Sequence, residues 1–160
     1  MGFELRPATT DDIPALAALW YPAWRDGHLG GVPDKLVALR TPDDFVRRAT
    51  DVQPYALVAA DADALLGFVA VKDDELDQLF VAAEARGTGV AGDLLHAGEQ
   101  LIAGAGHERA WLAVVATNAR ARRFYERHGW VDEGDFLFPA DTADGTIDVP
   151  CRRYAKTVSL

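Results

Sequence analysis

Residues 75 to 105 place an apolar strand-length run, a glycine-rich turn and a helical repeat in immediate succession. The strand run is "ELDQLFV", the turn contains "RGTGVAG", and apolar residues recur with a helical period from Thr88 to Ala105. A turn with few Cβ atoms that leads into a helix brings unpaired backbone N–H groups to the positive end of the helix dipole. We therefore predict a phosphate cradle here, with Arg86 as its cation. The alternative is a tight turn with a solvated Arg86, and the loop alone does not separate the two.

The segment "GTGVAG" also has the G-x-G-x-x-G spacing of dinucleotide-binding folds, but its surroundings differ from theirs. Five residues separate Val81 from Gly87, no acid ends the next strand, and 86 residues precede the loop. A P-loop is excluded because no Gly-Lys-Ser/Thr is present. These differences argue against a nicotinamide-dependent reductase, which we keep as a distant alternative.

The remaining patterns predict alternating strands and helices. Strands are expected at residues 3 to 7, 55 to 60, 65 to 71, 75 to 81, 111 to 116, about 130 to 138 and 147 to 156. Helices are expected from Thr10 to before Gly27, in a weaker stretch that is broken at residues 41 and 42 and runs to about residue 50, from residue 88 to 105, and from residue 118 to 128. Residues 61 to 63 should turn a hairpin, and residues 139 to 145 should connect the last two strands. This order predicts an α/β (α+β) fold with a mixed sheet and helices on both faces.

Composition limits the classes of protein that are compatible with the chain. A length of 160 residues, 49% of them apolar, fits one domain spanning residues 1 to 160. No apolar run approaches the roughly 20 residues of a membrane span, and the start lacks a signal-peptide pattern, so we expect a cytoplasmic protein. The net charge of -9 argues against nucleic-acid and membrane partners. The single cysteine, Cys151, has no partner for a disulfide and no metal-site pattern around it.

Two segments resemble a known family. "LDQLFVAAEARGTGVAGDLL" is similar to the acetyl-CoA loop of the GNAT superfamily of acyl-CoA-dependent N-acetyltransferases, whose pattern is met by Arg86, Gly89 and Ala91. "NARARRFYERHGW" is similar to the family's second element, and the two lie in the family's order. Ala83 departs from the pattern, since the family often has Pro there. The resemblance extends from residue 3 to about 155 and implies a mostly antiparallel sheet of about six or seven strands, splayed between strands 4 and 5, with about four flanking helices.

The resemblance also implies a cosubstrate, acetyl-CoA, and no metal. The pyrophosphate would bind backbone N–H groups of the loop, the pantetheine arm would lie along the fourth strand, and the N–H of Val81 would hold the oxyanion. Asn118 would bind the pantetheine arm, and Tyr125 would act as general acid toward the thiolate. The implied cofactor-binding residues are Leu79, Phe80, Val81, Arg86, Gly87, Thr88, Gly89, Val90, Ala91, Asn118, Arg120 and Tyr125.

The same residues also permit simpler structural interpretations. Asn118 is a good helix N-cap, and Tyr125 would suit the core of an amphipathic helix. The ribose phosphate of CoA is within reach of three arginines that would otherwise be a solvated helix face, namely Arg120, Arg122 and Arg123.

For the general base, the resemblance favours Glu75. Asp77 is the reserve, because a bulge in this strand would change which side chain faces the cleft. The alternative is that both acids only decorate a strand start. The acceptor pocket would be lined by Trp20, Tyr21, Trp24 and His28, although aromatic residues at helical spacing also suit a core. His28 and His128 are expected to be solvent-exposed or capping groups rather than bases.

The predicted activity is transfer of an acetyl group to a primary amine of a small molecule or peptide, directly within a ternary complex. A covalent intermediate on Cys151 is not expected, because this residue lies near the end of the chain, away from the loop. The alternative from another class is a non-catalytic GNAT-fold domain that senses acyl-CoA. The sequence leaves a homodimer open.

Overall fold

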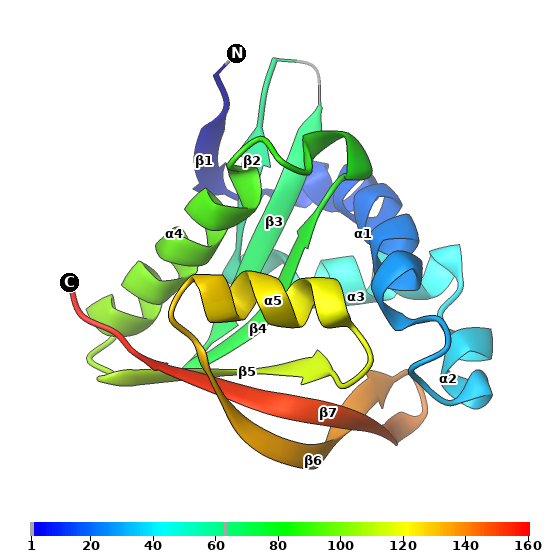
Figure 1. The fold of residues 1–160 in the computed structure, drawn as a ribbon. Coiled ribbons are helices and arrows are strands. Elements are labelled where there is room, and N and C mark those ends of the chain that lie inside the picture. Colours follow the sequence, from blue (N-terminus) through cyan, green and yellow to red (C-terminus); the bar gives the residue numbers. More distant parts are fainter. Residues whose placement is uncertain (1, 63) are drawn as a thin grey trace.

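A seven-stranded sheet forms the centre of the computed structural model, which describes residues 2–62 and 64–160 (Figure 1). Its order is β1-β2-β3-β4-β5-β7-β6. The pairing is antiparallel throughout except between β4 and β5, which are parallel. The strands are β1 (Glu4–Pro7), β2 (Ala56–Ala60), β3 (Leu65–Lys72), β4 (Glu75–Val81), β5 (Arg109–Val115), β6 (Val131–Thr142) and β7 (Gly145–Thr157).

Helices cover both faces of this sheet. The helices are α1 (Ile13–His28), α2 (Asp34–Leu39), α3 (Pro42–Val52), α4 (Val90–Gly104) and α5 (Ala119–Arg127). Phe68 of β3 belongs to the core under α1, α2 and α3, whereas its neighbour Val69 belongs to the core under α4 and α5. This alternation is what a strand buried on both faces produces. Figure 1 shows α4 and α5 on the near side of the sheet and α3 behind it.

The sheet opens between β4 and β5. These two strands share a single ladder pair, Glu75 with Trp111, in the described part of the chain. The open edge of β4 beyond this pair carries backbone donors. Ala82 donates its N–H to Leu66 of β3, and N–H groups alternate in direction along a strand, so the N–H of Val81 points into the splay. The predicted fold and its splay between strands 4 and 5 are confirmed.

The predicted break of the weaker helical stretch at residues 41 and 42 is confirmed, since α2 ends at Leu39 and α3 begins at Pro42 with Thr41 as its N-cap. Two expected boundaries were wrong. Helix α1 continues through Gly27 to His28. The expected connection at residues 139 to 145 is mostly strand, because β6 and β7 pair up to Thr142 and Gly145. Strand β6 lies at the edge of the sheet, where Pro139 is tolerated.

The predicted hairpin between β2 and β3 is present, although its turn includes residue 63, which lies outside the described residues. Within residues 2–62 and 64–160, no helix has the length and apolarity needed to cross a bilayer.

Candidate functional site

Two cavities meet at the splay between β4 and β5. The first, which we call the loop cavity, has a volume of about 380 Å³ and is bordered by the glycine-rich turn, the end of β4 and α5. The second, which we call the carboxylate cavity, has a volume of about 400 Å³ and contains Glu75 and Asp77 in its wall. Both cavities are lined by Leu79, Phe80, Asn118, Ala121 and Tyr125. A ligand in one cavity can therefore reach a ligand in the other across the open edge of β4.

The turn before α4 offers open space and unpaired donors to the loop cavity. Gly87 and Gly89 have φ values of 77° and 88°, and a Cβ atom added to either would meet no atom within 4 Å. Gly89 is the N-cap of α4 and supplies no side-chain cap. The first N–H groups of a helix have no partner within it, so those of α4 are available to an anion.

Arg86 lies at the mouth of the loop cavity and pairs with Asp26 of α1 at 2.9 Å. The side chains are 33% and 50% exposed, and a pair this exposed contributes little to stability, so an anionic ligand can compete for Arg86. Val90 and Thr88 differ from Arg86 in what they offer to a ligand. The side chain of Val90 is buried in the core, so this residue can offer only its backbone N–H. The hydroxyl and the backbone N–H of Thr88 both donate to the Ala85 carbonyl.

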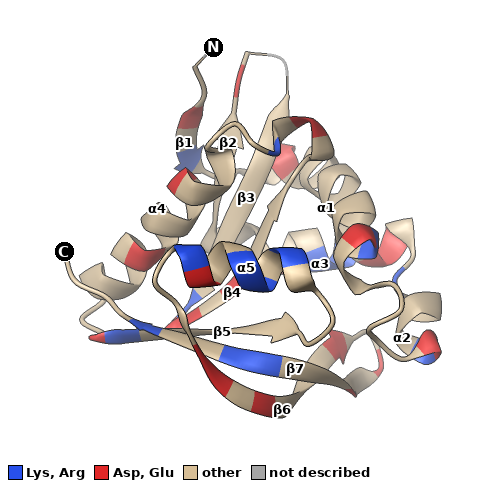
Figure 2. Ribbon diagram, in the orientation of Figure 1, with Lys and Arg blue, Asp and Glu red and all other residues tan. Residues whose placement is uncertain are grey.

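Helix α5 presents one face to the loop cavity. Arg120, Arg127 and His128 line it, together with Phe124 between them in the helix. Arg127 and His128 were missed by the sequence analysis, although their spacing of three and four residues from Phe124 places them on the same helix face. Figure 2 shows that basic residues gather on α5.

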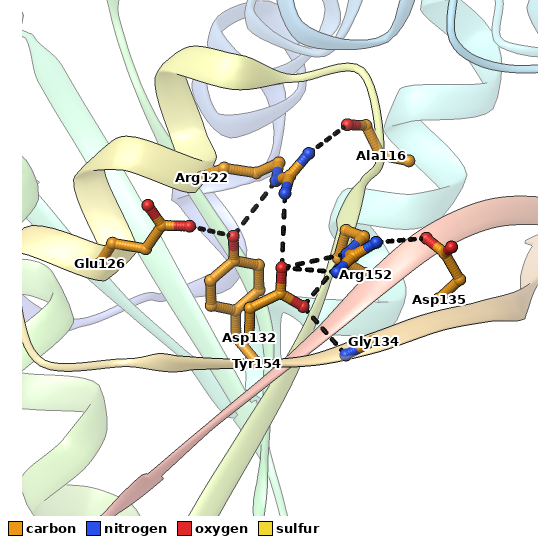
Figure 3. A network of polar contacts seen from close by, with 8 residues as sticks. All are labelled: Ala116, Arg122, Glu126, Asp132, Gly134, Asp135, Arg152 and Tyr154. Atoms are coloured by element: carbon orange, nitrogen blue, oxygen red, sulfur yellow. Dashed lines mark hydrogen bonds and ion pairs between the residues drawn. The ribbon is translucent and has the colours of Figure 1, made fainter.

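Arg122 takes no part in this cavity. Its guanidinium donates to the Tyr154 hydroxyl at 3.2 Å, to the Ala116 carbonyl at 3.0 Å and to Asp132 at 3.3 Å. Tyr154 in turn donates to Glu126 at 2.6 Å, and Asp132 also binds Arg152 (Figure 3). This network joins α5 to β6 and β7. It therefore holds in place the helix to which Asn118 and Tyr125 belong.

Asn118 and Tyr125 stand at the two ends of α5, where both cavities touch them. Asn118 is the N-cap of the helix, since its Oδ1 accepts a hydrogen bond from the Ala121 N–H at 3.2 Å. Its Nδ2 makes no hydrogen bond within the described chain. The Tyr125 hydroxyl likewise has no hydrogen-bond partner among the described residues, and burial raises the pKa of Tyr125 well above its usual value. A neutral phenol and a free amide donor therefore face the splay.

Glu75 and Asp77 enter the carboxylate cavity from β4. The register with β3 shifts there: Gln78 pairs with Ala70 and Leu76 with Val71, which leaves Asp77 as the extra residue of a bulge. Burial, and then the charge of Asp77, raises the pKa of Glu75 to about 7. Burial also raises the pKa of Asp77. Glu75 is consequently close to half ionised at neutral pH, which suits a general base.

Three of the four predicted aromatic and histidine residues line the carboxylate cavity. Trp20 and Trp24 are also part of the core, as their helical spacing allowed, and their role toward an acceptor stays a prediction. His28 is the last residue of α1 and is stacked on Trp24 at 4.6 Å, with its Nδ1 donating to the Trp24 carbonyl. Burial lowers the pKa of His28 to about 4, so the ring is neutral. Tyr21 does not line the cavity and packs against Phe45 instead.

Cys151 also lines the carboxylate cavity, contrary to the argument that it lies away from the site. Burial raises the pKa of its thiol to about 11, so it is protonated at neutral pH and is a poor nucleophile. Further charged residues of this cavity were not predicted from the sequence. They come from α2, α3, β3 and β6 or from residues next to these elements, and they share no motif: Arg40, Arg48, Asp51, Lys72 and Asp141.

Comparison with known proteins agrees with this architecture. A family model described as the Acetyltransferase (GNAT) family matches residues 14–130, which include the glycine-rich turn and α5. The chain belongs to the GNAT acetyltransferase family. An uncharacterized N-acetyltransferase of Mycobacterium tuberculosis is 29% identical to this GNAT chain over 138 residues, which cover 80% of the chain and 86% of that protein.

Solved GNAT structures have the same fold. A GCN5-related N-acetyltransferase from Rhodopseudomonas palustris superposes with a TM-score of 0.76 at 19% identity, and the match covers 99% of this chain and 97% of that one. The PaiA N-acetyltransferase from Thermoplasma acidophilum, solved in complex with coenzyme A, gives a TM-score of 0.70 at 17% identity and covers 98% and 99% of the two chains.

Proposed function

We propose that residues 1 to 160 form one N-acetyltransferase domain that transfers the acetyl group of acetyl-CoA directly to a primary amine of a small molecule or peptide. The observation that carries the proposal is the meeting of two cavities at the open edge of β4, with Tyr125 in the wall of both. A ternary complex needs such a geometry, because the thioester and the amine must approach from two sides of one point.

The loop cavity fits the cosubstrate. The open space at Gly87 and Gly89 and the unpaired N–H groups of α4 suit a pyrophosphate, with Arg86 as its cation. Arg120, Arg127 and His128 add donors along the same cavity. The free Nδ2 of Asn118 is available to the pantetheine arm.

The residues at the splay fit the chemistry of transfer. Val81 would stabilise negative charge on the thioester oxygen through its N–H. Glu75, with Asp77 beside it, would take the proton of the attacking amine, directly or through water. Tyr125 would donate a hydrogen bond to the departing thiolate. Cys151 contributes no covalent step, since its thiol is protonated at neutral pH.

The test is a CoA-release assay in which acetyl-CoA is combined with a panel of amines, polyamines, amino acids and short peptides. Catalysis predicts release of CoA with at least one acceptor, and the Tyr125→Phe variant should lower kcat by about 10²-fold while it retains CoA affinity. The Phe variant keeps the aromatic packing and removes only the hydroxyl.

A second outcome would favour the non-catalytic alternative. If calorimetry detects CoA binding but no acceptor in the panel releases CoA, and Tyr125→Phe changes nothing, the protein is a sensor of acyl-CoA rather than an enzyme. Protection against thermal unfolding by NADH but not by acetyl-CoA would contradict both.

A further inference from the structure

Three buried donors without partners lie in residues that line the carboxylate cavity. They are the indole Nε1 of Trp20, Nη1 of Arg48 and Nε of Arg40, none of which makes a hydrogen bond with the described residues. Leaving a buried donor without an acceptor destabilises a protein, so such groups are usually paired. Their occurrence in three residues of one cavity wall favours an occupant that brings hydrogen-bond acceptors.

Arg48 is the cation among these residues that is free to bind a ligand. Its guanidinium lies over the Trp20 ring at 4.3 Å, which brings two of the three donors together. Arg40 is held by Asp44 at 3.0 Å, and Arg47 of the same helix pairs with Asp44 and Asp141. Arg48 forms no hydrogen bond or ion pair with any described residue.

The charge of Arg48 is maintained despite its surroundings. Burial, and then the charge of Arg40, lowers the pKa of Arg48 to about 9, while Asp44 and Asp77 act in the opposite direction. The guanidinium is therefore still protonated at neutral pH. Arg48 is only partly exposed and has no carboxylate of a described residue in contact with it, so a bound anion would stabilise its charge.

The carboxylate cavity also contains Glu75 and Asp77, to which the proposed function assigns the amine. Resting on that proposed function, we propose that the acceptor is an amine that also carries a carboxylate, and that Arg48 and the indole N–H of Trp20 bind this carboxylate. The acceptor class is thus an amino acid or a related zwitterion rather than a polyamine. The amine lies at the acids of β4, and the carboxylate lies at α3.

A carboxylate fits better than a phosphate, which offers the same oxygen acceptors. One guanidinium is free and Lys72 is a further cation of the wall, but three aspartates, Asp51, Asp77 and Asp141, stand in the same wall. A dianion would be repelled by these acids more strongly than a monoanion would. The carboxylate also matches the planar, two-pronged geometry of guanidinium donors.

The experiment compares amino acids with their carboxamides, which differ only in the proposed contact. The ratio of kcat/KM for acid over amide is measured for the wild type, Arg48→Gln and Arg48→Lys. We expect the wild type to prefer the acid by about 10- to 100-fold, Arg48→Gln to lose this preference, and Arg48→Lys to retain part of it. An aminoalkyl phosphate of matched length is included and should react more slowly than the amino acid.

Arg47→Gln is the matched control, since it removes the same charge from the neighbouring position and should keep the preference for the acid. The proposal is overturned if the wild type uses acid and amide equally, if Arg48→Gln keeps the preference, or if the phosphate is the better acceptor. A second measurement does not depend on turnover. In the presence of CoA, the amino acid should protect the wild type but not Arg48→Gln against thermal unfolding. If the amino acid protects the protein but is not acetylated, the proposed acetyltransferase activity is contradicted, whereas the proposed binding of a carboxylate by Arg48 is still supported.

Discussion

The loop cavity and the carboxylate cavity share one wall but differ in the groups that they offer to a ligand. The loop cavity presents backbone N–H groups and exposed cations, of which Arg86 is an example. The carboxylate cavity presents buried ionisable side chains, and the strongly shifted pKa values of Glu75, His28 and Cys151 all belong to it. A pH dependence that comes from Glu75 would therefore belong to the carboxylate cavity and not to the loop cavity.

Gly89→Asp should have the largest effect on ligand binding, and this effect should be confined to the loop cavity. Any side chain strains the left-handed backbone at this position, although Asp adopts it more readily than most residues do, and the carboxylate of Asp would enter the space proposed for a pyrophosphate. We expect CoA affinity, measured by calorimetry, to fall by about 100-fold or more.

The matched control for Gly89→Asp is Gly30→Asp. Gly30 has a φ of 84°, a Cβ there would also meet no atom within 4 Å, and the residue lines neither cavity. Equal loss of CoA affinity in both variants would show that the loop only supports the fold.

Glu75→Gln should remove the pH dependence of the reaction rate that we propose for the carboxylate cavity. In the wild type, kcat/KM should increase as pH rises through about 7, because Glu75 releases its proton there. In the variant, this increase should be absent, and the rate at pH 8 should be lower by about 10²-fold. If the increase persists in the variant, Asp77 or another group is the base. Glu84→Gln, at an exposed position, is the control.

Glu75→Gln should also change the free energy of unfolding, and the burial of Glu75 determines the sign of this change. The pKa of Glu75 is higher in the folded state than in the unfolded chain, so the unfolded chain releases this proton at a lower pH. The protonated carboxyl therefore stabilises the fold at low pH, and this stabilisation is lost as pH rises from about 4.5 to 7. Glu75→Gln should therefore raise the unfolding temperature relative to wild type at pH 8 but not at pH 4. Thermal scans at the two pH values check the sign.

The two cavities also differ in how much of them the sequence predicts. The loop cavity comes from a contiguous turn and one face of α5. A local pattern, Arg86, Gly89 and Ala91, therefore indicated this site through the resemblance to the family, although the loop alone left a tight turn as the alternative. Strand β4 was predicted as well, whereas its bulge was considered only as a condition under which Asp77 would face the cleft, and the structure has a bulge there. The carboxylate cavity gathers Arg48 from α3 and Asp141 from β6, which lie 93 positions apart in the sequence. No local sequence pattern predicts that these residues lie close together, because their proximity depends on how the helices and the edge strand pack.

Gly27→Ala should have a smaller effect, at the wall that the two cavities share. A Cβ at Gly27 would lie 2.7 Å from Asn118 Nδ2, so the amide would have to shift. Alanine favours a helix over glycine by about 1 kcal/mol, so stability should be maintained while CoA affinity falls by roughly 3- to 10-fold. Gly104→Ala, in α4 with no atom within 4 Å of the added Cβ, should leave CoA affinity unchanged. If both variants bind CoA equally well, the Asn118 amide does not contact the ligand.

Arg122→Gln should have the smallest effect, because the network of Figure 3 lies outside both cavities. Loss of its contacts to Tyr154 and Asp132 should lower the free energy of unfolding by about 1 kcal/mol, since the side chains are partly exposed. Rates should fall only a few-fold as α5 loosens. Arg123→Gln, which removes an arginine that has no ion pair with the described residues, is the control, and equal destabilisation by both would exclude a role for the network.

Strand β6 gives the carboxylate cavity an outer wall that can vary independently. Phe138, Ala140 and Asp141 line the cavity from this strand, yet β6 is hydrogen-bonded to the sheet on one side only. Changes in residues 138 to 141 disturb one ladder, avoid the contact of Asp132 with Arg122 and leave the turn before α4 untouched. Under the proposed function, acceptor preference should therefore be open to evolution or engineering at these residues, while the proposed cosubstrate stays the same.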